Sequence, residues 1–116
     1  MTSGPAISAD NLYLYHVVSG QSTIYRSVLE GGIRPFLPEV FVRLNDNEGY
    51  PDGITLDRAG CLWVALWDGS GVRRYDSDGK LMLHIRFPCA RITKVAFGGA
   101  DLMTAFVTTA RIGLAA

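Results

Sequence analysis

Along most of the chain, apolar and polar residues follow one another in short runs, and helical periodicity is nearly absent. The runs are rich in Val, Ile, Tyr, Phe, Trp and Thr, and Gly, Asp, Asn and Ser separate them. This pattern predicts an all-β fold of short antiparallel strands. We expect strands near residues 5–8, 12–18, 23–29, 39–44, 53–57, 61–66, 71–76, 80–87, 93–98 and 103–109.

The predicted strands recur as a set. One copy reads ISADNLYLYHVVSGQSTIYR, the next reads ITLDRAGCLWVALWDGSGVRRY, and a third begins at ITKVAFGGADLMTAFVTTA. Asp10 thus recurs as Asp57, and Arg26 recurs as Arg74. A period of roughly 40–50 residues with four strands per unit is typical of β-propeller blades.

The repeat predicts one partial propeller domain spanning residues 1–116. Its blades are expected at about 1–46, 47–88 and 89–116, the last of them incomplete. Because such an arc leaves blade faces and strand edges uncovered, we expect the chain to self-associate, with a homodimer as the favoured form. Whether closure takes five or six blades stays open.

Composition narrows the possible partners. Eleven basic and eleven acidic residues cancel without a basic stripe, which argues against nucleic acid and anionic membranes as partners. No apolar run approaches the ~20 residues of a membrane span, and the N-terminal segment lacks a signal-peptide pattern, so we expect a cytoplasmic protein. Cys61 and Cys89 are accordingly expected to be free thiols.

The tripeptide Pro51-Asp52-Gly53 has two interpretations. Pro-Asp-Gly is a common turn sequence, which makes Asp52 a turn residue. Alternatively, Asp52 is a carboxylate held at a strand entrance to bind a metal ion. Glu48, four residues earlier, is either a second acid of such a site or a solvated loop residue.

The segment that begins with this tripeptide, PDGITLDRAGCLWVALWDGSGVRRYDSDGK, resembles the SMP-30/gluconolactonase/luciferin-regenerating-enzyme family, which includes regucalcin. FGGADLMTAFVTTAR resembles a second segment of the family, and SGPAISADNLYLYHVVSGQSTIYR resembles a third more loosely. Together these segments cover nearly the whole chain. They correspond to the C-terminal part of a family member, about two and a half of six blades.

The resemblance implies a propeller with one divalent metal near the central channel and, in many members, hydrolysis of lactones or related esters. The family's ligands are a Glu near its N-terminus, the Asn of an Asn-Gly motif and the Asp of PDG, which Asp52 matches. Asp52 is therefore implied as a metal ligand and general base. Oxygen ligands of this kind suit Ca²⁺, Mg²⁺, Mn²⁺ and sometimes Zn²⁺. The metal would polarise the carbonyl of a small lactone while a carboxylate activates water.

Two substitutions depart from the family pattern. Ser3 stands in place of the Asn ligand, and Val18 stands in place of a family Asp. The blade that supplies the Glu lies outside the matched region. We therefore expect one copy of the chain to be inactive or incomplete as a lactonase, and a non-catalytic structural or interaction module is the alternative.

Two further residues are candidates for a substrate pocket. Trp67 ends an apolar strand where a propeller loop borders the channel mouth, so it either flanks a pocket or packs at the edge. Thr93 matches a Thr common in the family and is expected to satisfy backbone groups near the channel.

Other chemistry-bearing residues are expected to be structural. Trp63 is expected in the core, and His16 and His84 are expected on strand faces. The equivalent repeat positions of Arg26 and Arg74 favour a role such as binding the loop of the next blade.

Overall fold

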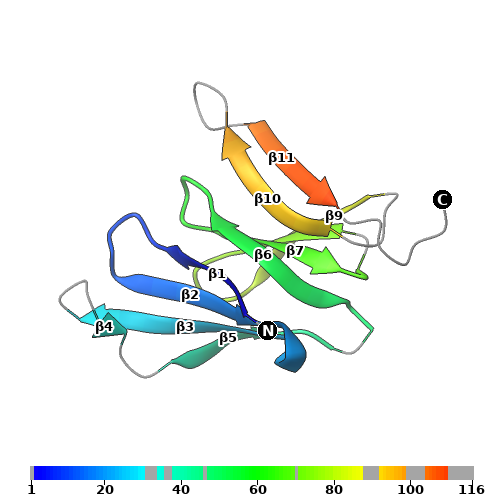
Figure 1. The fold of residues 1–116 in the computed structure, drawn as a ribbon. Helices are drawn as coiled ribbons and strands as arrows, with labels where there is room; N and C mark the ends of the chain where they lie inside the picture. Colours follow the sequence, from blue (N-terminus) through cyan, green and yellow to red (C-terminus); the bar gives the residue numbers. More distant parts are fainter. Residues whose placement is uncertain are drawn as a thin grey trace.

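The computed structural model describes residues 2–30, 34–35, 38–45, 47–69, 71–87, 92–98 and 104–109, and the side chains of residues 5–18, 20–29, 38–45, 47–69 and 71–87. The described residues form antiparallel sheets (Figure 1). Their elements are β1 (Thr2–Ile7), β2 (Tyr13–Val18), the 3-10 turn η1 (Ser19–Gln21), β3 (Thr23–Glu30), β4 (Arg34–Pro35), β5 (Glu39–Arg43), β6 (Tyr50–Leu56), β7 (Leu62–Trp67), β8 (Gly71–Tyr75), β9 (Leu81–Arg86), β10 (Ile92–Gly98) and β11 (Thr104–Thr109). Within these ranges, no helical segment has the length and apolarity needed to cross a bilayer.

The sheets repeat one four-stranded pattern. The first sheet is ordered β1-β2-β3-β5, with the short β4 also pairing with β3, and the second is ordered β6-β7-β8-β9. The hairpin β10-β11 follows. The first strands of the three units, β1, β6 and β10, lie side by side and run in the same direction (Figure 1). The predicted all-β class and four-stranded units are confirmed, whereas the blade boundaries after residues 46 and 88 fall on residues outside the described ranges.

The hydrophobic core lies between the first two sheets. On β7, alternate residues Leu62, Val64 and Leu66 are buried against the first sheet, as the period-2 geometry of a strand requires. Burying each such side chain stabilises the fold by about 1.5–3 kcal/mol. The core comprises Tyr15, Val17, Ile24, Leu44, Ile54, Leu62, Val64, Leu66 and Tyr75. Trp63 was expected in this core, but it is half-buried and lies outside the cluster because its position alternates to the opposite face of β7.

Two turns of the second sheet are built alike. Asp57 opens the turn between β6 and β7, and Asp76 opens the turn between β8 and β9. Each carboxylate accepts the backbone N–H groups two and four residues later at 2.9 Å. Gly60 and Gly79 complete the turns with φ of +83° and +81°, a backbone conformation that glycine adopts without steric cost. The sequence predicted both turns.

Pro51-Asp52-Gly53 does not form such a turn. It lies inside β6, which begins at Tyr50 rather than near residue 53. The register of β6 on β7 shifts so that Asp52 and Gly53 stand opposite one residue, Ala65. This is a β-bulge, which bends a strand and re-aims its side chains. The turn interpretation is therefore wrong, because pairing with β7 overrides the local turn preference.

The first two sheets are joined by Arg26. Its Nη1 donates a 2.7 Å hydrogen bond to the backbone oxygen of Ser77 in the β8–β9 turn, which confirms that Arg26 binds a loop of the next unit. Arg74 has the equivalent position on β8, since each arginine lies opposite an aromatic residue of the preceding strand. Arg74 instead pairs with Asp57 of its own sheet at 2.8 Å.

Other residues predicted from the sequence also have defined places. His16 lies on a strand face, as expected, and stacks on Tyr25 with ring centroids 5.3 Å apart. Cys61 is a buried free thiol, as expected. Cys89 lies outside the described residues.

Candidate functional site

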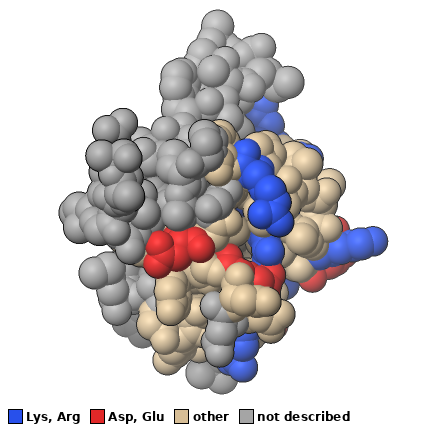
Figure 2. All heavy atoms as spheres, turned by 90° about the vertical axis from the view of Figure 1, so that its right-hand side faces the viewer, with Lys and Arg blue, Asp and Glu red and all other residues tan. Residues whose placement is uncertain are grey.

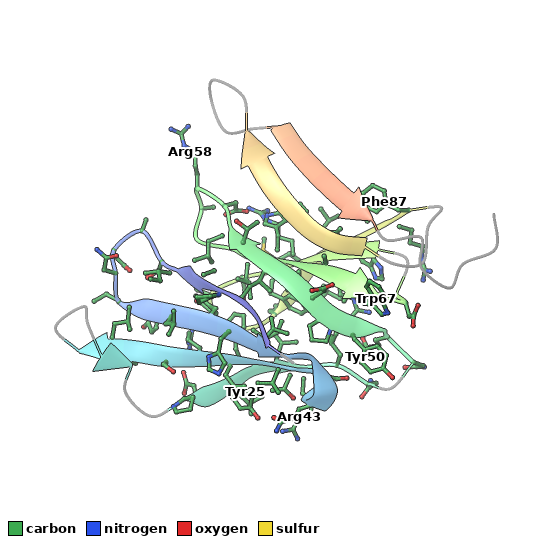
Figure 3. All side chains as sticks on the ribbon, in the orientation of Figure 1. Tyr25, Arg43, Tyr50, Arg58, Trp67 and Phe87 are labelled. Carbon is green, nitrogen blue, oxygen red and sulfur yellow. The ribbon has the colours of Figure 1, made fainter. Side chains whose placement is uncertain are left out.

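The candidate residues lie at one end of the sheets. At this end β1, β6 and β10 begin and β7 finishes (Figure 1). Asp52 is half-buried on β6, and Trp67, also half-buried, closes β7 opposite the exposed Tyr50. Figure 3 shows Tyr50 and Trp67 near each other at this end. Thr93 lies near the start of β10, but its side chain is outside the described part, as is that of Ser3 on β1.

The carboxylate of Glu48 anchors the segment that enters β6. Its Oε1 accepts the backbone N–H of Asn45 at 2.7 Å, and the backbone N–H of Glu48 donates to the Asn45 oxygen at 3.0 Å. Its Oε2 pairs with Nη1 of Arg73. The Asn45 N–H, followed by Arg73, lowers the pKa of Glu48 below its usual range. Glu48 is therefore a bound acid, and the interpretation as a solvated loop residue is wrong.

Close backbone packing fixes the next residue. Gly49 has φ of +88°, and a Cβ there would lie 2.6 Å from the backbone nitrogen of Gly69. Only glycine fits such an approach without displacing its neighbour. The entry to β6 is thus pressed against the β7–β8 turn.

Arg73 is the centre of a polar network within the second sheet and the loop that enters it. Its Nη1 lies 3.2 Å from the Tyr75 hydroxyl oxygen, and its Nε donates to Nδ1 of His84 at 3.3 Å. Burial, then the charges of Arg73 and Arg86, lower the pKa of His84. The Nε2 of His84 is buried and has no partner among the described residues. Reasoning from the sequence missed this network, because its members lie on three different elements.

A groove of about 370 Å³ adjoins this network. It is lined by Phe41, Val42, Arg43, Leu44, Glu48, Arg73, Tyr75, Gly79 and Leu81. Among the described candidates, Glu48 contributes to this lining and Asp52 and Trp67 do not. The structure therefore separates Glu48, whose side chain turns toward β8, from Asp52 on β6.

Charges on this side of the molecule are mixed. Figure 2 shows acidic and basic side chains next to one another in the described part of the surface. This distribution agrees with the net charge of zero and favours a neutral ligand over a polyanion.

The described residues do not by themselves fit a metal ion. Among their side chains, no group of three or more His, Cys, Asp or Glu is close enough to hold one. Asp52 supplies one carboxylate, whereas Ca²⁺ prefers about six to eight oxygen ligands.

The chain matches a known family along most of its length. The model described as SMP-30/Gluconolactonase/LRE-like region matches residues 1–111. This match confirms the resemblance seen in the sequence.

Several named relatives are similar to this chain in sequence. A 6-deoxy-6-sulfogluconolactonase of Pseudomonas putida is 38% identical over 96% of this chain and 38% of its own length. Pentonolactonase XacC of Haloferax volcanii is 36% identical over 93% of this chain and 38% of its own length. A regucalcin of Danio rerio is 40% identical over 62% of this chain and 25% of its own length. The chain thus spans about 40% of the first relatives it matches.

Solved structures also match nearly all of this chain with only part of their own length. A calcium-binding regucalcin from Agrobacterium tumefaciens superposes with a TM-score of 0.91 at 30% identity, covering 99% of this chain and 40% of that protein. A luciferin-regenerating enzyme gives a TM-score of 0.89 at 28% identity, covering 98% and 39%. A gluconolactonase from Xanthomonas campestris gives 0.80 at 32% identity, covering 93% and 34%. The two four-stranded sheets therefore match a portion of a six-bladed propeller.

Proposed function

The chain belongs to the SMP-30/gluconolactonase/LRE-like family, and on that premise we propose that it contributes Asp52 to a lactone-hydrolysing site. The observation that carries the proposal is the position of Asp52. It lies in a bulge on the first strand of its sheet, at the end where the first strands of all three units begin. Bulges of this kind are frequent next to active sites.

The chemistry follows from the carboxylate. Asp52 accepts a proton from water, the water oxygen bonds to the lactone carbonyl carbon, and the ring C–O bond breaks. The ring oxygen leaves as an alkoxide and takes the proton from Asp52, giving a hydroxy acid. A divalent ion such as Ca²⁺, Zn²⁺, Mg²⁺ or Mn²⁺ would need oxygen ligands in addition to Asp52, since the described side chains form no ligand set.

The site is proposed to be incomplete within one copy and to form in a homodimer. The edge strand β9 supports self-association, since Leu81, Met82 and Leu83 are 45%, 51% and 43% exposed. Exposed apolar groups gathered on one strand are typical of interaction surfaces. Two identical chains would cover such an edge by symmetric pairing.

The test follows hydrolysis of glucono-δ-lactone against protein concentration, with sedimentation velocity on the same samples. We expect activity per chain to rise as the dimer forms and to disappear in Asp52→Asn. Activity that stays constant while the chain remains a monomer would contradict the assembly. Activity retained in Asp52→Asn would contradict the role of Asp52.

A non-catalytic module is the second candidate, and the Ser3 and Val18 substitutions favour it. Titration calorimetry with Ca²⁺, Zn²⁺ and Mn²⁺ on the protein and on Asp52→Ala separates the two. Micromolar binding that Asp52→Ala abolishes supports a metal-assisted hydrolase. A stable dimer that neither hydrolyses lactones nor binds these ions supports the module.

A further inference from the structure

Glu48 is held on two sides although the family resemblance assigns it no ligand role. One carboxylate oxygen accepts the Asn45 N–H, and the other pairs with Arg73. The side chains of Glu48 and Arg73 are only 23% and 11% exposed, so solvent screens their attraction less than at an open surface. This pair ties the loop before β6 to β8, two strands away in the same sheet.

A short and fixed stretch of backbone connects Glu48 to Asp52. Gly49 packs against the β7–β8 turn, and Tyr50 and Pro51 pair with the last two residues of β7. Pro51 is fully buried. The bulge that carries Asp52 starts directly after these residues. A displacement of Glu48 would therefore also shift the backbone at Asp52.

Other contacts hold the Arg73 side chain in place independently of Glu48. Its guanidinium is also within hydrogen-bond distance of Tyr75, which is 4% exposed, and of Nδ1 of His84. His84 packs over Gly71, where a Cβ would lie 2.4 Å from its Nε2. Arg73 is therefore a rigid anchor between β8 and β9.

We propose that Glu48 is a positioning residue for Asp52, and that its pair with Arg73 sets where the bulge of β6 presents the carboxylate. The inference rests on the proposed function for its catalytic consequence. Its structural consequence is independent of activity.

The first experiment measures amide hydrogen exchange by NMR in the assembled protein. Glu48→Gln keeps the shape of the side chain and an oxygen for the Asn45 N–H, but removes the charge. Since a hydrogen bond to a charged group contributes appreciably to stability, exchange at Asp52 and Gly53 is expected to rise at least about tenfold. Glu39→Gln is the matched control, because it removes the charge of the Arg26–Glu39 pair in the first sheet. It should leave exchange at Asp52 and Gly53 unchanged.

A double-mutant cycle tests whether Glu48 and Arg73 act on Asp52 through their mutual contact. Arg73→Gln should raise the exchange rates at Asp52 and Gly53. In the double variant these rates should be no higher than in the single variant with the larger increase. Additive effects, or faster exchange confined to β8 and β9, would overturn the proposal.

Kinetics supply the readout that separates positioning from general weakening. In Glu48→Gln, kcat for lactone hydrolysis should fall about tenfold while KM changes less than about twofold, since misplacement of a reacting group affects the transition state most. Equal loss in kcat and in the folded fraction would overturn the proposal. If the unsubstituted protein hydrolyses no lactone, the hydrolase proposal fails, and the exchange data alone decide the role of Glu48.

Discussion

The two ends of the second sheet use their aspartates differently. At one end, Asp57 and Asp76 accept the backbone N–H groups of the turns that they open. Asp57 also accepts the indole N–H of Trp63 at 2.9 Å and pairs with Arg74 at 2.8 Å. At the other end, Asp52 lies within a strand, on a bulge, and its loop is anchored by the neighbouring acid Glu48. An aspartate of this sheet is therefore a turn builder at one end and a candidate for chemistry at the other.

The hydrogen-bond donors around Asp57 explain its structural role. Asp57 is surrounded by donors from its own sheet, which leaves its oxygens occupied. Burial alone would raise its pKa, but the bonds from Trp63, Cys61 and Arg74 lower it overall. Such a group stays ionised and stabilises the fold.

The largest effect is expected from Asp57→Ala. The substitution leaves the turn N–H groups, the Trp63 indole and the Arg74 guanidinium without their acceptor, so we expect a loss of about 2–4 kcal/mol in the free energy of unfolding. Urea denaturation measures it. Asp76→Ala is the matched control, since it removes the same two backbone bonds, and it should cost about 1 kcal/mol. Equal losses in both variants would show that the Trp63 and Arg74 contacts add nothing.

The glycines of the two turns differ in their surroundings. A Cβ on Gly79 would lie 2.7 Å from the backbone oxygen of Phe41 in the first sheet, whereas a Cβ on Gly60 meets nothing within 4 Å. Gly60→Ala should therefore cost about 1 kcal/mol from its positive φ alone. Gly79→Ala should cost about 2 kcal/mol because the packing of the two sheets must also adjust. Thermal unfolding of the two variants checks the order, and a smaller loss for Gly79→Ala would contradict this packing.

Acid should weaken the end that carries Glu48. The pKa of His84 is lowered from its ordinary 6.5, first by burial and then by Arg73 and Arg86, so the unfolded chain takes up the proton first. Stability therefore falls as the pH drops below 6.5. The lowered pKa of Glu48 adds a second loss below its ordinary 4.5, because its contribution is present above that pH and disappears as it is protonated.

His84→Gln isolates the first of these losses. The variant should flatten the dependence of the free energy of unfolding on pH just below 6.5, and leave the loss below 4.5 in place. Denaturant titrations at a series of pH values measure both. If the free energy of unfolding of the variant still falls just below pH 6.5 as it does in the unsubstituted protein, a group other than His84 causes that loss.

The local pattern was sufficient for the strands and for the turns that Asp57 and Asp76 open. Alternation predicted the bounds of β2, β3, β7 and β8 within one or two residues, because short amphipathic runs between turn residues typically form strands. The motif at Asp52 had two interpretations, and the turn interpretation was wrong because the local preference for a turn is weaker than pairing with β7. The Glu48–Arg73 pair joins residues 25 positions apart across an intervening strand, so it becomes visible only once the register is known. The role of Arg26 was accessible because the repeat itself pointed to it.

The smallest effect on stability is expected at Asp52, and it gives the most direct test of the account. Asp52→Asn preserves the size of the side chain and removes the basic carboxylate. The rate of lactone hydrolysis by the assembled protein should fall at least about a hundredfold, while the midpoint of thermal unfolding stays within about 2 °C. A hydrolysis rate that survives the substitution, or a stability loss as large as that of Asp57→Ala, would show that Asp52 is a structural residue like the aspartates at the opposite end.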